Sequence, residues 1–423
     1  MSKIILHIDL NAFFARAEEI KDPFLIGKPV AIGNDGRSGI VSTCSYKARE
    51  YGIHSGMPMF QAKMLCKNLI IKPCDFKFYE LLSKEFIHHV RSFTPYVEQA
   101  SIDECYADVT DTYRKYGNND IMAYLKRIQD ELFKKTGLYC SIGVASTKFL
   151  AKMGSDIKKP MGITIIRNRD IKNIIFPLPI KSYFGIGNKT YPKLNEIGIK
   201  TIGDLYYRLK NNKDDKKINE ILGNFEDDII ACLEGNSNDS LFLGEFDPKS
   251  IGRTSTFEED SNDIDFILPF ILELSDDVIS EMKEKKKMCK TIQVTYKTGG
   301  HTSEFKTKTC AKSFDEYIDD SDVLKKEIEK LVKNTYDGSL LRMAGISVKN
   351  LEDKSTKPIQ MNFDNMGRFE NENKAKLLAQ ELNREANKDI FFVGTELKKR
   401  NKYGTKWGIF IFFTILFIWK KSY

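Results

Sequence analysis

The chain of 423 residues lacks the features that mark several classes of protein. Its eight cysteines are scattered and form no CxxC pair, so neither a zinc site nor a disulfide framework is expected. The first residues show no charged segment followed by an apolar core and a cleavage site, as a secretory signal would. The apolar run 407–419 is shorter than the roughly 20 residues that span a bilayer. We therefore expect a cytoplasmic protein with no stable membrane association.

Positive charge is concentrated in one part of the chain. The formal net charge is +7, and most of the excess lies between Glu281 and Lys312. A basic patch of this kind is typical of a surface that binds nucleic acid, although a solvated helix face is the alternative. The segment 290–312 alternates as a strand does, which favours the binding surface. The candidate DNA contacts in it are Lys290, Lys297, Lys306 and Lys308.

The length predicts several domains, because one hydrophobic core seldom serves so long a chain. The first half predicts a strand at 3–9, a hairpin at 96–109, an amphipathic helix at 120–135 and a strand at 139–145. With the helical segments between them, these follow the order of a ferredoxin-like α+β domain. Residues 11–75 would be an insertion above its sheet.

The second half predicts two further domains. Gly185 and Gly187 begin a segment that resembles a helix-hairpin-helix module, whose glycines let backbone N–H groups approach a DNA phosphate. A plain glycine-rich turn between helices is the alternative. Residues 250–350 alternate strand-like segments with helices at 264–285 and 320–336, which predicts another small α+β domain.

Three carboxylates are placed at the ends of predicted strands. Asp9 ends the first strand, and Asp103 and Glu104 lie at the hairpin. Adjacent acids repel each other and raise each other's pKa. A magnesium ion removes this penalty and keeps coordination positions open for phosphate. The three acids therefore predict a metal site for phosphoryl transfer, with a buried structural acid pair as the alternative.

Four motifs carry a family resemblance. They are His7–Ala15, Ser42–Arg49, Ser101–Glu104 and Lys158–Gly162. Through them residues 3–350 resemble the Y-family translesion DNA polymerases, closest to the DNA polymerase IV branch. The resemblance implies a multidomain α+β fold, which we divide as follows: a ferredoxin-like palm (1–10 and 76–166), inserted fingers (11–75), a helix-hairpin-helix thumb (167–240), an α+β little finger (246–350) and a C-terminal tail (351–423).

The resemblance also implies a role for each site residue. Asp9, Asp103, Glu104 and the carbonyl oxygen of Leu10 would hold two Mg²⁺ ions, with the three acids as the catalytic residues. Phe14 would be the steric gate that excludes the 2′-hydroxyl of a ribonucleotide. The contacts to the incoming nucleotide would be made by Thr43, Tyr46, Arg49 and Lys159. Asn11 stands where many relatives carry an acid, so we expect no metal role for it.

The implied activity is DNA-templated addition of dNTPs to a primer 3′ end, in translesion synthesis and repair, with low fidelity and without proofreading. The implied partners are primer-template DNA, dNTPs and the replicative sliding clamp, with the protein a monomer associated with the nucleoid. The clamp-binding peptide would run to Phe363 and include Gln360, with an ordinary linker as the alternative.

Two rival functions remain to be weighed. A palm-fold nucleotidyl cyclase also pairs acids on a hairpin, but it has no use for a helix-hairpin-helix segment or a lysine-rich last domain. A catalytically inactive family member could serve as a DNA-bound scaffold. The intact acids Asp9, Asp103 and Glu104 favour an active enzyme instead.

Overall fold

The computed structural model describes residues 3–354 except 117–119, 213–214, 224, 238, 245 and 300–304. The predicted clamp-binding residues Gln360 and Phe363 and the apolar run 407–419 lie outside the described residues. Within the described part of the chain, no helix is both long and apolar enough to cross a membrane.

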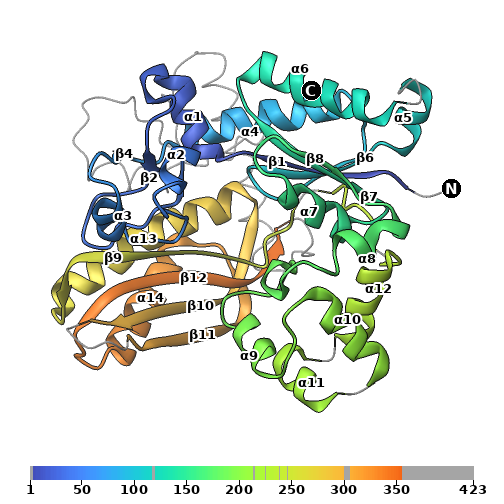
Figure 1. Ribbon diagram of the computed structural model, residues 1–423. Helices are drawn as coiled ribbons and strands as arrows, with labels where there is room; N and C mark the ends of the chain where they lie inside the picture. The colour runs from blue at the N-terminus through green and yellow to red at the C-terminus, as the bar shows by residue number, and fades with distance from the viewer. Residues whose placement is uncertain are drawn as a thin grey trace, which may run out of the picture.

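The first sheet has five strands in the order β5-β6-β1-β7-β8. Their bounds are β1 (Ile5–Leu10), β5 (Val97–Gln99), β6 (Glu104–Asp108), β7 (Cys140–Ala145) and β8 (Ile163–Ile165). The central strand β1 runs antiparallel to both β6 and β7, and β8 is parallel to β7. Helices α4 (Phe76–Arg91) and α6 (Ile121–Thr136) lie along one face and α7 (Lys148–Ile157) along the other (Figure 1). The predicted ferredoxin-like palm is therefore confirmed.

The two faces of β1 have different surroundings because successive side chains of a strand alternate. Leu6, Ile8 and Leu10 are buried in the core that includes α4 and α6. Ile5 belongs to the core on the α7 side, and Asp9, four residues on, shares its face. Asp9 therefore lies at the end of the strand, on the side that α7 covers.

Helix α7 packs unusually close to the sheet because small residues meet at the contact. A Cβ atom on Gly143 of β7 would lie 1.9 Å from the carbonyl oxygen of Ala151, and one on Gly154 would lie 3.2 Å from the Cα of Gly143. Only glycine fits at such a close approach of two backbones. The short distance brings the polar side chains of α7 within reach of β1.

A smaller three-stranded sheet, β3-β2-β4, forms the fingers. The elements here are α1 (Phe13–Lys21), η1 (Pro23–Leu25), β2 (Val30–Ile32), β3 (Thr43–Cys44), α2 (Tyr46–Arg49), α3 (Met59–Leu65) and β4 (Ile70–Lys72). Strand β3 begins only at Thr43, because the chain before it still turns at Gly39, whose N–H donates to the carbonyl of Gly36. Helix α1 buries Phe13 in the core of the palm sheet, so that core crosses the predicted boundary at residue 11.

The next part of the chain is helical. After α5 (Thr110–Tyr116) in the palm, it contains η2 (Asn168–Asp170), α8 (Ile171–Ile174), η3 (Ile180–Ser182), α9 (Tyr191–Glu196), α10 (Ile202–Asn211), α11 (Lys216–Leu222) and α12 (Glu226–Glu234). Gly198 turns the chain between α9 and α10 with φ +87°, a conformation that favours glycine. A capping box between Thr201 and Asp204 then starts α10. Gly185 and Gly187, which begin the predicted helix-hairpin-helix segment, lie just before α9.

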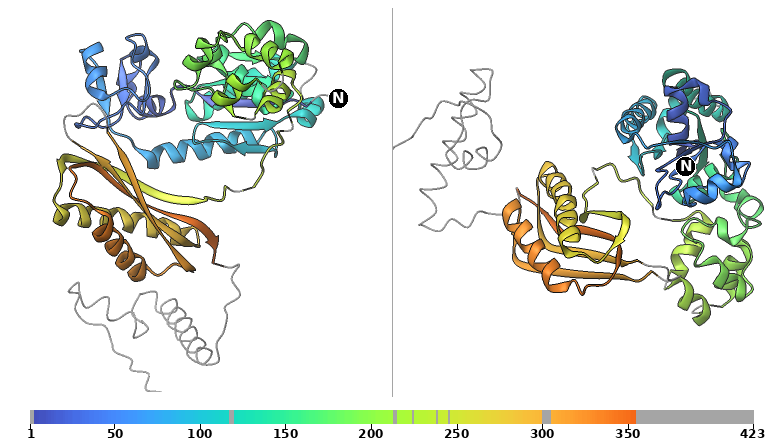
Figure 2. Two further views of the ribbon diagram at one scale, coloured as in Figure 1. Left: turned by 90° about the horizontal axis from the view of Figure 1, so that it is seen from below. Right: turned by 90° about the vertical axis from the view of Figure 1, so that its left-hand side faces the viewer.

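The last described sheet has the order β11-β10-β12-β9. Its elements are β9 (Ser250–Ser261), α13 (Ile264–Glu284), β10 (Lys287–Thr298), β11 (Thr307–Ile318), α14 (Ser321–Thr335) and β12 (Leu341–Asp353). Both helices pack on one face of the sheet (Figure 2). The predicted α+β little finger is confirmed, with its two helices within two residues of the expected bounds.

Candidate active site

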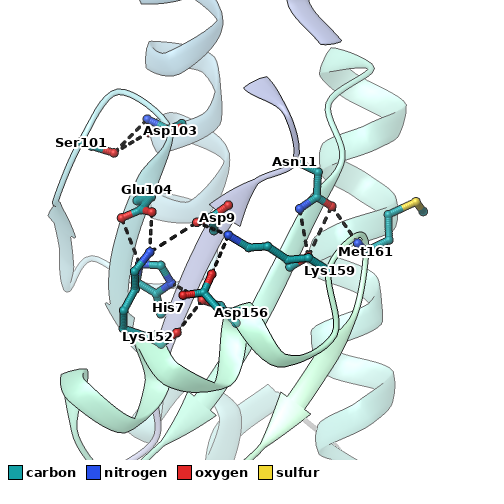
Figure 3. Close-up of polar contacts among 12 residues, drawn as sticks. His7, Asp9, Asn11, Ser101, Asp103, Glu104, Lys152, Asp156, Lys159 and Met161 are labelled. Atoms are coloured by element: carbon teal, nitrogen blue, oxygen red, sulfur yellow. Dashed lines mark hydrogen bonds and ion pairs between the residues drawn. The ribbon is translucent and has the colours of Figure 1, made fainter. Parts of the chain in front are cut away.

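Asp9 and Glu104 face each other across neighbouring strands. Asp9 at the end of β1 pairs in register with Glu104 at the start of β6. Residues directly opposite in an antiparallel pair have their side chains on the same face of the sheet. Both carboxylates therefore project toward α7, where Figure 3 shows them side by side. This part of the predicted acid cluster is assembled by strand pairing alone.

Two lysine side chains neutralise this acid pair. The Lys152 ammonium donates to Glu104 Oε1 at 2.5 Å and lies 3.5 Å from Asp9 Oδ2. The Lys159 ammonium donates to the same Asp9 oxygen at 2.8 Å and also pairs with Asp156 at 2.7 Å. Burial, together with contact with Glu104, raises the pKa of Asp9 to about 7 despite these lysines. Burial would raise the pKa of Glu104 as well, but hydrogen bonds with His7, Asp9 and Lys152 lower it. The two carboxylates are thus close enough to share one proton, as ligands of a single cation would be.

The third predicted ligand, Asp103, is not brought into this pair. It precedes β6, and its carboxylate accepts a hydrogen bond of 2.6 Å from the Ser101 hydroxyl (Figure 3). Its backbone carbonyl accepts from the N–H of Leu10 at 2.9 Å, which ties the hairpin to the end of β1. Within the described residues, no group of three or more His, Cys, Asp or Glu side chains is arranged to hold a metal ion. The oxygen donors of Asp9 and Glu104 nevertheless suit a hard divalent cation.

Three of the predicted nucleotide contacts lie near this acid pair. The Arg49 guanidinium stacks over the Tyr46 ring, 4.6 Å from its centroid. The buried Tyr46 hydroxyl has no hydrogen-bond partner among the described residues. Burial raises the pKa of Tyr46, and the positive charges of Arg49 and Lys159 both oppose that rise. The hydroxyl is thus an unsatisfied polar group near two cations, as a triphosphate contact would be. Thr43 lies in β3, three residues before Tyr46.

Asn11 positions the turn that carries Lys159. Its side-chain oxygen accepts a hydrogen bond of 2.7 Å from the N–H of Met161, and its amide donates to Ser141 at 2.9 Å. Because Met161 follows Lys159 by two residues, these bonds fix the chain beside the acid pair. The residue for which no metal role was expected thus has a structural one (Figure 3).

Phe14, the predicted steric gate, is a partly buried ring held by its aromatic neighbours. It stacks on Tyr79 with ring centroids 4.5 Å apart and planes at 12°. Tyr79 is itself buried and donates from its hydroxyl to Glu18 at 2.8 Å. The neighbouring Phe13 is a core residue, only 2% exposed. The structure thus places Phe13 in the core and leaves Phe14 partly buried against it.

Comparison with known proteins agrees with this geometry. A model of the impB/mucB/samB family matches residues 8–156, and the model of its C-terminal domain matches 248–363. DNA polymerase IV of Oceanobacillus iheyensis is 35% identical over 403 residues, which are 95% of this chain and 93% of that protein. DNA polymerase IV 1 of Bacillus subtilis is 34% identical over 406 residues, 94% of each chain. The chain belongs to the Y family of DNA polymerases.

Solved structures of the Y family show the same fold. A chimera of the polymerases Dbh and Dpo4 is similar with a TM-score of 0.71 at 26% identity, covering 83% of this chain and 100% of the other. An insertion ternary complex of Dbh is similar with a TM-score of 0.57 at 27% identity and the same coverage. The predicted family is confirmed, and with it a DNA-directed DNA polymerase in place of a nucleotidyl cyclase.

Sequence reasoning missed several polar residues of this Y-family site. Lys152 and Ser155 of α7, and His7 of β1, form a buried network beside Glu104. His7 shares a hydrogen bond of 2.8 Å with the Ser155 hydroxyl, and its other ring nitrogen lies 3.5 Å from Glu104. The available signal was a lysine at 152 within the apolar run Phe149–Met153, where a surface lysine would not be expected.

The predicted DNA contacts are distributed over two surfaces of this polymerase. Gly185 and Gly187 are exposed on either side of the buried Ile186, with open space where a Cβ atom would lie. On the little finger, Lys297 and Arg342 both stack on the ring of Phe305, at 5.4 and 4.9 Å. A DNA phosphate would meet open main chain at the two glycines and two cations at Phe305.

Lys308 does not share the face of Lys297. It pairs in register with Tyr296, which is buried under α14, and its ammonium donates to Asp337 at 2.9 Å just after that helix. Lys297 is one residue further along β10 and so points to the opposite face. Lys290 stacks over Tyr317 at 5.8 Å, and Lys306 is exposed just before β11 begins at Thr307. The lysine-rich window is therefore not a single patch.

Proposed function

We propose that this Y-family polymerase extends a primer 3′ end on damaged or undamaged template, using two Mg²⁺ ions held by Asp9, Asp103, Glu104 and the Leu10 carbonyl. The observation that supports it most is the cross-strand pairing that brings the carboxylates of Asp9 and Glu104 side by side at the end of β1. For Asp103 to join them, its carboxylate must leave the Ser101 hydroxyl. When bound, the ions activate the primer hydroxyl and neutralise charge on the phosphates.

The residues of the chain then hold and select the nucleotide. Arg49 supplies a planar fork and Lys159 a compact charge for the triphosphate, and the Tyr46 hydroxyl gains the hydrogen-bond partner it lacks. Thr43 is proposed to contact the same group from β3. Phe14 lies beneath the sugar and excludes a 2′-hydroxyl. The reaction joins the primer 3′-oxygen to the α-phosphorus and releases pyrophosphate.

The polymerase activity is tested by primer extension with the purified full-length chain and each dNTP separately. Templates with and without a minor-groove guanine adduct distinguish lesion bypass from ordinary synthesis. We expect extension on both templates and no degradation of a mismatched primer end. Failure to extend either template in the presence of Mg²⁺ would contradict the proposal and favour the DNA-bound scaffold.

We propose that Lys297 contacts the DNA backbone and that Lys308 does not. Each neutralised phosphate steepens the dependence of log affinity on log salt by about 0.9. Lys297→Ala should therefore reduce that slope by about one unit, while Lys308→Ala, which removes a lysine already paired with Asp337, should leave it unchanged. The measurement is fluorescence anisotropy of labelled primer-template over a salt series. Equal slopes for the two variants would contradict the assignment.

We also propose the domain boundaries, the remaining DNA contacts and the clamp-binding peptide. We keep the palm at 1–10 and 76–166, the fingers at 11–75, the thumb at 167–240 and the little finger at 246–350. Gly185, Gly187, Lys290 and Lys306 remain proposed DNA contacts.

Gln360 and Phe363 are proposed to bind the sliding clamp, with the enzyme acting as a monomer on the nucleoid in the cytoplasm. Loss of clamp binding in a Phe363→Ala variant would test the peptide.

A further inference from the structure

Lys152 is a buried cation in the middle of α7. It is only 8% exposed, although lysine is almost never buried without a charged partner. Its ammonium reaches both members of the acid pair, at 2.5 Å from Glu104 and 3.5 Å from Asp9. The close packing of α7 on β7 through Gly143 and Gly154 fixes the distance from the helix to these acids. Lys152 is therefore built into the site and does not reach it from the surface.

The acid pair needs a cation whether or not a metal ion is bound. Two neighbouring carboxylates that share a partly desolvated site repel each other strongly. A divalent ion and an ammonium group relieve this repulsion through the same carboxylate oxygens. A fixed ammonium beside these oxygens also repels an incoming divalent cation. The ammonium group and the divalent ion are therefore alternative partners for these carboxylates.

Lys159 differs from Lys152 in ways that suit a different task. Its side chain is 26% exposed, against 10% for Lys152, and it is shared between Asp9 and Asp156. It follows α7 on a separate turn, and a triphosphate could draw it away from Asp9. Lys152 comes from the body of the helix and has the acid pair itself as its partner.

We propose that Lys152 is a resident counter-ion: its ammonium occupies the Asp9–Glu104 pair in the metal-free enzyme and competes with the divalent cation for the same oxygens. The inference rests on the proposed metal site. Lys152 is a positioning residue in this scheme, because it holds the two ligands in place before the ion arrives. It also lowers the affinity for that ion, because a fixed positive charge repels an incoming cation.

The first test measures Mn²⁺ affinity by electron paramagnetic resonance. The sample is the full-length protein with a dideoxy-terminated primer-template and a non-hydrolysable dNTP analogue at pH 8. Lys152→Met should bind Mn²⁺ about tenfold more tightly than the wild type, since a fixed positive charge near the ion is gone. Lys152→Gln should behave in the same way, and Lys152→Arg, which keeps the charge, should stay close to the wild type.

A matched control is available on the same helix. Lys148 lies one turn before Lys152 and pairs with Glu98 at 2.7 Å, away from the acid pair. Lys148→Met should leave Mn²⁺ affinity unchanged. If Lys152→Met and Lys152→Gln bind Mn²⁺ no more tightly than Lys148→Met, or more weakly than the wild type, Lys152 is not a competing counter-ion.

The second test is thermal unfolding, which does not depend on activity. In metal-free buffer Lys152→Met should melt below the wild type, because the buried Asp9 and the partly buried Glu104 have lost a partner, and saturating Mn²⁺ should remove most of the difference. A deficit that persists at saturating Mn²⁺ would mean that Lys152 has only a packing role. Asp9→Asn and Glu104→Gln separate the two proposals: if they still bind Mn²⁺ as the wild type does, the metal site itself is wrong, whatever Lys152 does.

Discussion

Glu104→Gln is expected to reduce the rate of primer extension by on the order of a thousandfold, the loss typical when one group that stabilises a transition state is removed. Glutamine has nearly the shape of glutamate and can still accept from Lys152, so the strand pairing with Asp9 should persist. What is lost is a negative charge that binds the metal ion. Single-turnover extension with Mg²⁺ measures the effect, and Asp9→Asn should match it.

The same variant should still bind primer-template, because the proposed DNA contacts on the thumb and little finger are unchanged. Asp108→Asn is the matched control: it lies on the same strand, β6, and accepts from the Thr110 hydroxyl and N–H, which an asparagine oxygen can also do. It should extend primers at the wild-type rate. Near-wild-type extension by Glu104→Gln would contradict the proposed mechanism.

Asp103 gives a separate result, because the structure turns it toward Ser101. If it joins the metal site during catalysis, Asp103→Asn should be as inactive as Glu104→Gln. If it acts only as the acceptor for Ser101, Asp103→Asn should retain most of the activity, since an asparagine oxygen can accept the same hydrogen bond. The comparison of the two variants in one extension assay decides whether the site has two or three acidic ligands.

The sequence predicts the elements of the palm well because they depend on local patterns. Asp120 caps α6 and Thr147 caps α7, and both helices begin at the next residue. The approach of Asp9 to Glu104 also follows from a short hairpin beside the first strand. Such features need only the alternation of one strand and the residues of one turn.

The parts that the sequence does not predict depend on contacts between distant segments. The face on which Lys308 lies is set by its register opposite Tyr296, and a shift of one residue would place it with Lys297 instead. Lys152 is part of the site only because Gly143 lets α7 lie against β7. Neither the register nor the helix–sheet distance is visible in a single sequence.

Phe14→Ala is expected to raise the ratio of ribonucleotide to deoxynucleotide incorporation by about a hundredfold, a selectivity that steric exclusion of one hydroxyl can reach. The stack on Tyr79, whose hydroxyl is bound to Glu18, holds the Phe14 ring in one place. A rigid ring excludes a 2′-hydroxyl, whereas a mobile one would move aside. Extension of one primer with ATP and with dATP, under single-turnover conditions, gives the ratio.

Phe13→Ala separates this gate from a general loss of packing. Phe13 is 2% exposed in the core shared by α1 and the palm sheet, so its truncation should lower stability by about 3–5 kcal/mol and leave sugar selection unchanged. Phe14→Ala should show the reverse, with a smaller loss of stability because Phe14 is only partly buried. Phe14→Tyr, which keeps the ring, should retain discrimination against ribonucleotides. If Phe14→Ala unfolds as Phe13→Ala does and still rejects ribonucleotides, Phe14 is a core residue and the gate lies elsewhere.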